Sequence, residues 1–287
     1  MKIVKPPPRP EPALLAPTAT PVPTPVPAPV AKGKKRTKRL GAKLGSKTPT
    51  PVPTPAFRKL PNRAFAVGEK LTFAVQYAGA TAGFATLSVK GIEKQSGRDC
   101  FHIQATARTH PFFETFFKVR DTIDSFIDAE SLFSWRYEKH LQEGGFKGDS
   151  FFIYDQVRHK LVDDHGNEND MVAETQDVMS CFYLFRAMDL EVGKSLTIPV
   201  TADDKKSYEL KVDVLKKEKV KVLAGKFDTI LVQPHLAFQG VFQQKGEVFI
   251  WVTDDARHIP VKIKSKIVIG SINIILQDAE WADPQAK

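Results

Sequence analysis

Short runs in which apolar and polar side chains alternate recur from about residue 65 to the end of the chain. In the first run, Leu71, Phe73, Val75 and Tyr77 are separated by smaller or more polar residues. A period of two residues is typical of a β-strand with one buried and one exposed face. Similar runs occur at 84–89, 101–108, 121–127, 134–141, 146–154, 157–162, 208–215, 219–223, 229–234, 241–252, 260–268 and 271–281. These short segments predict a mainly β domain, an antiparallel barrel-like, clam-like or sandwich fold of about a dozen strands.

One segment, residues 175–188, departs from this alternation. Its apolar residues recur at helical spacing and share one face: Val178, Cys181, Phe182, Phe185 and Met188. Thr175 belongs to the residue types that cap helix N-termini. We therefore expect an amphipathic helix of about four turns that plugs the barrel mouth or covers a sheet edge. The same helix is expected to divide the domain into a longer N-terminal sheet and a shorter C-terminal sheet.

The first 63 residues have a different composition. They hold 16 of the 21 prolines, and their 14 basic residues face the single acid Glu11, which gives a net charge of +13. The remaining residues carry 28 basic and 32 acidic side chains, a net charge of −4. Such a leader cannot bury enough apolar surface to offset the entropy of ordering. We expect a disordered, proline-rich tail at 1–63, a β domain at 64–282 and a short C-terminal tail at 283–287.

A basic cluster lies inside this leader, between two copies of the sequence TPVPTP at 20–25 and 50–55. Its members are Lys32, Lys34, Lys35, Arg36, Lys38 and Arg39. Such a cluster is suited to bind polyanions, for example anionic lipid headgroups, wall polymers or nucleic acid. Nucleic acid is disfavoured because no aromatic residue precedes Phe57 and the rest of the chain is net acidic. The cluster is thus interpreted as a tether to an envelope protein or anionic polymer, or as a solvated linker.

Seven segments of the chain resemble the DUF3108 family. They are FAVGEKLTF at 65–73, AGFATL at 82–87, FFETFFKVRD at 112–121, QDVMSCFY at 176–183, LEVGKSLTIPV at 190–200, GKFD at 225–228 and FIWVTDDARHIPV at 249–261. The resemblance spans about residues 65–281 in order. It implies a bacterial protein that is exported or envelope-associated, in the periplasm or cell envelope, and it implies no catalytic residues.

The N-terminus does not show the export signal that such a location predicts. Met1 and Lys2 begin as a secretory signal does, but prolines follow from Pro6 and no apolar core of roughly 7–15 residues is present. Either the protein is not exported by that route, which leaves a cytoplasmic location open, or its natural start lies upstream of Met1.

Four aromatic residues, Phe112, Phe113, Phe116 and Phe117, stand outside strand periodicity. They could form the lid or mouth of a site for an apolar ligand. Alternatively, they belong to a short helical turn that pins the sheet and packs them in the core, and this is the interpretation we prefer, because aromatic side chains chiefly supply buried area.

Charged residues on neighbouring predicted strands are the second candidate ligand-binding group. Arg120, Asp121 and Arg136, with Glu143 and Asp155 nearby, would form a network inside a barrel if their side chains pointed inward. Pointing outward, they would form surface pairs of small energetic value. The outward orientation is the default for charged residues.

The sequence predicts no metal site and no cofactor. None of the seven histidines has the spacing of a metal-binding pair. In the acid-rich stretch 163–170, Gly166 is at the fourth position, whereas an EF-hand calcium loop has its glycine at the sixth. Cys100 and Cys181 lie 81 positions apart, and whether they form a disulfide stays open.

Three functions are compatible with these features. The first is a non-enzymatic binding protein whose β domain holds an apolar or amphiphilic ligand, such as a lipid or glycolipid. The second is a structural or assembly protein that docks envelope components through sheet edges and the basic tail. The third is a glycan-processing hydrolase, which needs two carboxyl groups about 5–9.5 Å apart in a groove.

Overall fold

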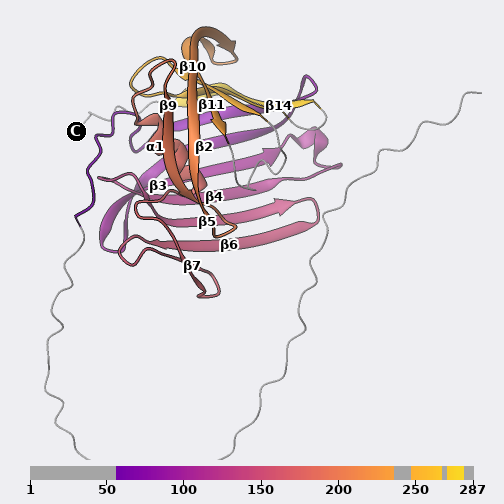
Figure 1. Cartoon of the computed structure of the whole chain (residues 1–287). Helices are drawn as coiled ribbons and strands as arrows, with labels where there is room; N and C mark the ends of the chain where they lie inside the picture. Colours follow the sequence, from indigo (N-terminus) through magenta and orange to yellow (C-terminus); the bar gives the residue numbers. More distant parts are fainter. Residues whose placement is uncertain (1–55, 236–246, 267–269, 281–287) are drawn as a thin grey trace, which may run out of the picture. The chain divides into compact units, whose positions relative to one another are not determined.

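The computed structural model describes residues 56–235, 247–266 and 270–280. The described residues form fourteen strands in one antiparallel sheet, with a short 3₁₀ helix η1 and one α-helix, α1 (Figure 1). The first eight strands are β1 Lys70–Tyr77, β2 Ala80–Gln95, β3 Arg98–Thr109, β4 Arg120–Asp128, β5 Ser134–Glu143, β6 Phe146–Asp155, β7 Lys160–Asp163 and β8 Glu168–Asp170. The other six are β9 Ser195–Thr201, β10 Ser207–Val222, β11 Gly225–His235, β12 Val248–Thr253, β13 Pro260–Lys266 and β14 Ser271–Glu280. The helices are η1 Pro111–Phe113 and α1 Val178–Arg186.

The mainly β, barrel-like fold is therefore confirmed, but the division into two sheets was wrong. Neighbouring strands in the sequence pair with one another, and β1 pairs on one side with β2 and on the other with β14. This pairing joins the strands before α1 to those after it, so the order runs from β8 through β1 and β14 to β9. A helix inserted in the sequence does not divide a sheet when the first and last strands, β1 and β14, pair with each other. The predicted tail at 1–63 lies almost wholly outside the described residues, as does 283–287.

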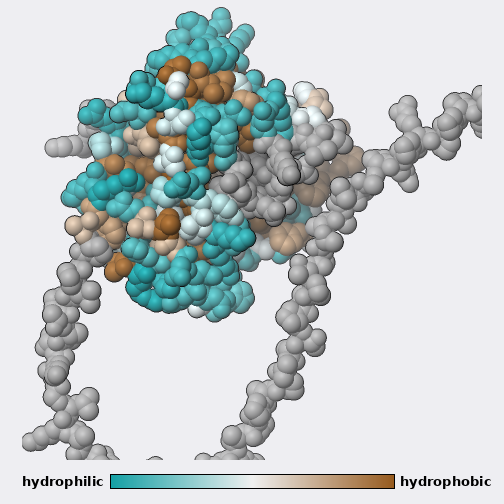
Figure 2. All heavy atoms as spheres, viewed as in Figure 1, coloured by the Kyte–Doolittle hydropathy of each residue, from teal (hydrophilic) through white to brown (hydrophobic). Residues whose placement is uncertain are grey.

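The inner face of the sheet packs around α1. Helix residues Cys181, Leu184 and Phe185 belong to the same buried cluster as Ile103 of β3 and Val232 of β11. The outer face is solvated along much of its length, and on the side shown in Figure 2 hydrophilic residues predominate, with hydrophobic residues exposed in small groups between them. This division between the faces agrees with the period of two in the sequence.

The helix α1 is shorter than expected, and Asp177, not Thr175, is its N-cap. The Asp177 carboxylate accepts from the backbone N–H groups of Met179 and Ser180, both at 2.7 Å, and the Ser180 hydroxyl accepts from the Asp177 N–H at 2.8 Å. This reciprocal arrangement is a capping box, which fixes the first helical residue at Val178. Thr175 instead hydrogen-bonds the hydroxyl of Thr201 at 2.9 Å.

The residues before α1 run along the edge of the sheet. Gln176 forms a parallel bridge with Val200 of β9, donating to Pro199 O and accepting from Thr201 N, both at 2.9 Å. The edge strand β9 is thereby covered at this point, which limits its capacity to pair with another chain. Within the residues described, no helix has the length and apolarity that a membrane span requires.

Candidate functional site

A cavity of about 330 Å³ lies between α1 and the inner face of the curled sheet. Its lining comes from three places that are far apart in the sequence: β2 to β4, one side of α1, and strands β9 to β14. The apolar lining residues are Ala85, Leu87, Ala105, Ala107, Ile123, Val178, Met179, Cys181, Phe182, Phe185, Ile198, Leu210, Val212, Val232, Pro234, Val248, Ile250, Ile263 and Ile274. Pockets of this size and character are typical of small-molecule sites.

The space arises from small side chains placed opposite one another. Ala85 of β2 pairs with Ala107 of β3, and Leu87 pairs with Ala105, so three alanines occupy adjacent inward positions. Further along the same strands the inward positions are Val89 and Ile103, which are buried in the core. Because alanine fills less of the layer under the sheet than valine or isoleucine, the core is solid at one end and hollow at the other.

Asp121 is the one carboxylate among the described lining residues. It is half-buried at the start of β4, and its Oδ1 accepts from the Gln142 N–H at 2.9 Å. Burial raises the pKa of Asp121 above its ordinary value. Burial and the nearby Asp121 charge also raise the pKa of Glu143. The remaining polar lining residues are Thr86 and Thr106.

The four predicted phenylalanines do not form part of the core. Phe112, Phe116 and Phe117 are 72%, 82% and 57% exposed, and Phe113 is half-buried. The preferred core interpretation was wrong for the three exposed residues. They stand in the loop between β3 and β4, where η1 and the turn after it lift them out of the sheet.

The predicted charged network is not assembled either. Arg120 forms an ion pair with Glu114 at 3.0 Å, within its own loop and the start of β4. Arg136 lies on the outer face, where its guanidinium stacks over Phe126 and Phe151 at 5.2 and 4.9 Å from the ring centroids. Asp121 alone of the seven predicted ligand-binding residues lines the cavity. The ligand-binding role of the set stays a prediction.

The acid-rich turn between β7 and β8 stabilises the fold through the Asp163 carboxylate. Oxygen and nitrogen atoms of Asp163, Asp164 and His165 lie within 4.8 Å of one another. However, Asp163 accepts from the Asn167 backbone at 2.8 Å, from the Asn167 side chain at 3.0 Å and from Lys205. The Lys205 ammonium and the Asn167 amide lower the pKa of Asp163. Its carboxylate therefore organises the β7–β8 turn and ties it to the β9–β10 turn.

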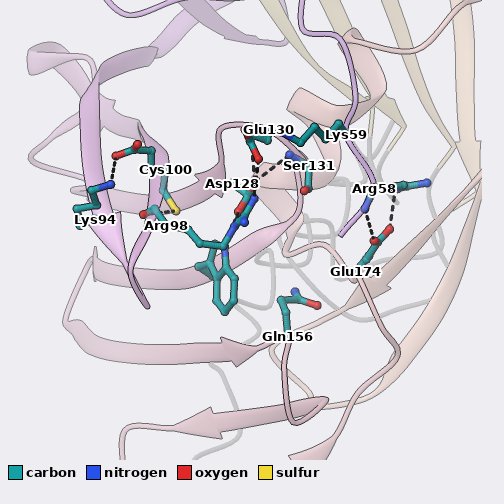
Figure 3. A network of polar contacts seen from close by, with 12 residues as sticks. Arg58, Lys59, Lys94, Arg98, Cys100, Asp128, Glu130, Ser131, Gln156 and Glu174 are labelled. Carbon is teal, nitrogen blue, oxygen red and sulfur yellow. Dashed lines mark hydrogen bonds and ion pairs between the residues drawn. The ribbon is translucent and has the colours of Figure 1, made fainter. Parts of the chain in front are cut away.

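A second polar network holds the segment before β1 against the sheet (Figure 3). At its centre the buried Asp128 accepts from Arg98 Nη2 and Trp135 Nε1, both at 2.9 Å, and from the Ser131 N–H at 2.8 Å. Arg58 pairs with Glu174 at 2.8 Å on the other side of the view. The named donors and acceptors pair with one another and stabilise the fold, whereas the Ser131 hydroxyl and Gln156 Oε1 are buried without a hydrogen-bond partner.

The two cysteines are both free and both buried. Cys100 belongs to an outer-face cluster with Phe133 and Trp135, whereas Cys181 is on α1 inside the sheet. The question that the sequence left open is answered by this placement, because the two thiols lie on opposite sides of the sheet.

The lining of the cavity could not be identified from the sequence, although one signal was present. The alternation of alanine with larger residues in 101–108 indicates small inward positions. Strand pairings between distant parts of the chain decide whether those positions face α1. No local sequence pattern predicts these pairings.

No curated protein matches this chain. Among solved structures, the chain is similar to a β-barrel-like protein of the DUF1849 family from Brucella abortus, with a TM-score of 0.50 and 10% identity over 77% of this chain and 100% of that one. A candidate exported protein with a YmcC-like fold from Bacteroides fragilis matches with a TM-score of 0.29 and 12% identity over 78% of this chain and 100% of that one. A candidate lipoprotein from Parabacteroides distasonis matches with a TM-score of 0.29 and 8% identity over 79% and 100%. The first likeness agrees with the barrel-like fold. The model of the protein family of unknown function DUF3108 matches residues 72–277, and the chain belongs to that family.

Proposed function

We propose that this protein is a non-enzymatic, envelope-associated binding protein whose β domain encloses the apolar chain of an amphiphilic ligand, a lipid or glycolipid. The observation that carries the proposal is the cavity between α1 and the sheet, whose lining is apolar except for two threonines and Asp121. The envelope setting is supported by the resemblance to DUF3108, which implies exported or envelope-associated members.

The energetics of the cavity favour an alkyl chain. Each methylene group moved from water into an apolar site contributes about 0.8 kcal/mol. At about 330 Å³, the cavity lies near the lower end of the range found for ligand pockets. A single chain therefore suits it better than a bulky multi-chain lipid, unless part of the ligand stays outside.

Asp121 is the one carboxylate of the described lining and is only partly buried, so the polar end of the ligand is placed beside it. The polar end of an amphiphile would meet this carboxylate. The alternatives from the sequence have less support. A hydrolase needs a second carboxyl group, and the described lining holds only one. Docking through sheet edges is hindered at β9, where Gln176 is already bridged to Val200.

The test is calorimetric titration of the full-length protein with octanol, decanol and dodecanol. We expect affinity to rise about fourfold for each added methylene, as about 0.8 kcal/mol requires, until the cavity is full. The double variant Ala105→Leu/Ala107→Leu fills the hollow end and should abolish binding. Ser88→Leu is the matched control, because alternation along β2 places Ser88 on the outer face.

Two results of the alkanol titration would contradict the proposal. Alkanols that bind the filled variant as well as the natural chain, or that show no dependence on chain length, would remove the cavity from consideration as the site. Circular dichroism and thermal unfolding of both variants establish that each remains folded.

A further inference from the structure

Exposed phenylalanines gather in two neighbouring loops of the domain. Phe112, Phe116 and Phe117 stand in the loop between β3 and β4, and Phe146 follows the turn between β5 and β6. Their side chains are between 53% and 82% exposed. We propose that these four residues, the phenylalanine rim, insert into the interfacial region of an anionic lipid bilayer and dock the protein there. This goes beyond the proposed ligand function, because docking is measured without any ligand in the cavity.

Direct contacts join the two loops into one surface. Val119, at the end of the first loop, bridges to Glu143 at the start of the second, and the Gly144 N–H donates to Lys118 O at 2.7 Å. The Phe117 ring lies over Gly144, where a Cβ atom would approach it to 3.0 Å. The glycine therefore makes room for the ring, and the rim is a single structural feature.

The first loop is ordered although its aromatic side chains are exposed. Phe116 N and Phe117 N both donate to Phe113 O at 3.0 Å, and Phe113 N donates to His110 O at 2.8 Å. His110 Nδ1 also accepts from Phe112 N at 3.2 Å. A loop fixed in this way presents its rings to solvent in a set position. Exposed apolar groups concentrated in one region are typical of interaction surfaces.

Charge favours a bilayer as the occupant. The loops and their flanking strands are balanced in charge, since Arg108, Lys118, Arg120 and Lys147 stand beside Glu114, Asp121, Glu143 and Asp149. The excess positive charge comes from the leader at 1–63, which has a net charge of +13. Stable attachment to membranes generally needs two weak signals, such as an apolar insertion and a polybasic segment that attracts anionic headgroups. This chain carries both signals. Docking of another protein molecule on the rim would not require the polybasic segment.

The position of the rim beside the cavity adds a reason for docking. Asp121, which lines the cavity, lies two residues after Val119 of the rim-bearing loop. A bilayer in contact with the rim would therefore be next to Asp121 and the end of the cavity that Asp121 lines. An apolar ligand could pass between the two with little exposure to water.

The test is co-sedimentation of the full-length protein with vesicles of phosphatidylcholine mixed with phosphatidylglycerol, and with vesicles of phosphatidylcholine alone. The natural chain is expected to bind the anionic vesicles, and to bind them less as salt is raised. Phe112→Ser/Phe116→Ser should lower the partition coefficient by at least about tenfold, because two exposed rings lose their apolar contact. Ile92→Ser/Leu223→Ser is the matched control, since it removes two exposed apolar side chains elsewhere.

Three results would overturn the proposal: absence of vesicle binding by the natural chain, equal loss in both double variants, and unchanged binding by the rim variant. A dimer that the rim variant converts to a monomer would show instead that the rim contacts a second copy. Should the rim variant unfold, Phe116→Trp provides the second measurement. Its fluorescence must shift to the blue with anionic vesicles, by more than that of the natural chain.

Discussion

Arg186 and Glu69 form a bidentate ion pair that is removed from solvent on both sides. Arg186 Nη1 lies 2.7 Å from Glu69 Oε1, and Nη2 lies 2.8 Å from Oε2, while the two residues are 0% and 2% exposed. Arg186 also donates to Ala64 O at 2.9 Å. The pair thereby joins the C-terminus of α1 to the segment that enters β1, and it holds the helix inside the sheet.

Glu69→Ala is expected to destabilise the domain by about 3–5 kcal/mol, because it leaves a buried guanidinium without its counter-charge. The measurement is the free energy of unfolding in urea. Glu280→Ala is the control, since Glu280 pairs with Lys70 on the surface at 2.8 Å and exposed pairs contribute roughly 0–1 kcal/mol. Equal losses in the two variants would show that the buried pair adds nothing beyond an ordinary surface contact.

The N-cap of α1 gives a second stability prediction. The fully buried Asp177 accepts from Met179 N, Ser180 N and the hydroxyls of Ser125 and Ser134. Asp177→Ala removes the cap and leaves these buried donors unpaired, so we expect a loss of about 3 kcal/mol. Asp177→Asn keeps one acceptor oxygen and should lose less than the alanine variant.

Thermal and urea unfolding of both Asp177 variants provide the comparison, with Asp99→Ala as a control for loss of an exposed acid that pairs with Lys94. If the alanine variant is no less stable than the control, the four donors find water or other acceptors, and the cap is not important for the fold.

His102 predicts a dependence of stability on pH. Its Nε2 lies 2.7 Å from Asp124 and its Nδ1 lies 2.9 Å from Glu93. The hydrogen bond to Asp124 raises the pKa of His102 above 6.5, with the charges of Asp124 and Glu93 acting in the same direction against desolvation. A raised pKa means that the folded state binds the proton more tightly than the unfolded chain. The stabilisation is therefore complete below pH 6.5 and is lost as the pH rises through the folded-state pKa.

His102→Gln should lower the free energy of unfolding by about 1 kcal/mol at pH 6 and change it less at pH 9. The measurement is a series of urea denaturations across that range. His140 also has a raised pKa, chiefly through its hydrogen bond to Asp149, so a His140→Gln variant separates its contribution. A pH profile that is unchanged by His102→Gln would contradict the assignment.

Particular elements show how far the sequence determines the fold. The hairpin predicted at 134–141 and 146–154 is present as Ser134–Glu143 and Phe146–Asp155, because alternation and a Gly-Gly turn are local signals. The pairing of β1 with β14 joins residues about 200 positions apart, such as Leu71 and Ala279, and no local signal contains it. The prediction of two sheets failed at this pairing.

The side-chain orientation of charged residues was the second limit. Asp121 and Arg136 look alike in the sequence, as charges within alternating runs, yet one lines the cavity and the other stacks on outer-face aromatic rings. A slip of one residue in register reverses the face of every side chain, so register must be known before a site can be assigned. For the same reason, the sequence did not predict that Ala85, Ala105 and Ala107 line the cavity, although their small size creates it.

Asp121 predicts which amphiphiles the cavity accepts. A carboxylate beside the polar end of the ligand repels an anionic headgroup, and two like charges about 4 Å apart cost between about 1 and 4 kcal/mol in a surface environment. The full-length protein should therefore bind decanol at least about tenfold more tightly than decanesulfonate, which has the same chain and a permanent negative charge. Asp121→Asn should bring the two affinities together, whereas Asp149→Asn, an exposed acid on β6, should leave them apart.

Lowering the pH should change the affinity for decanesulfonate in the same direction as the Asp121→Asn substitution. Burial raises the pKa of Asp121 above 3.8, so its carboxyl takes up a proton at a higher pH than an exposed aspartate does. As the pH falls through that raised value, the repulsion disappears and decanesulfonate should bind the natural chain more tightly. Asp121→Asn, which has no proton to gain, should show no such change. Calorimetric titration at several pH values measures both effects. Decanesulfonate that binds as tightly as decanol at neutral pH would place the headgroup away from Asp121, even with the chain in the cavity.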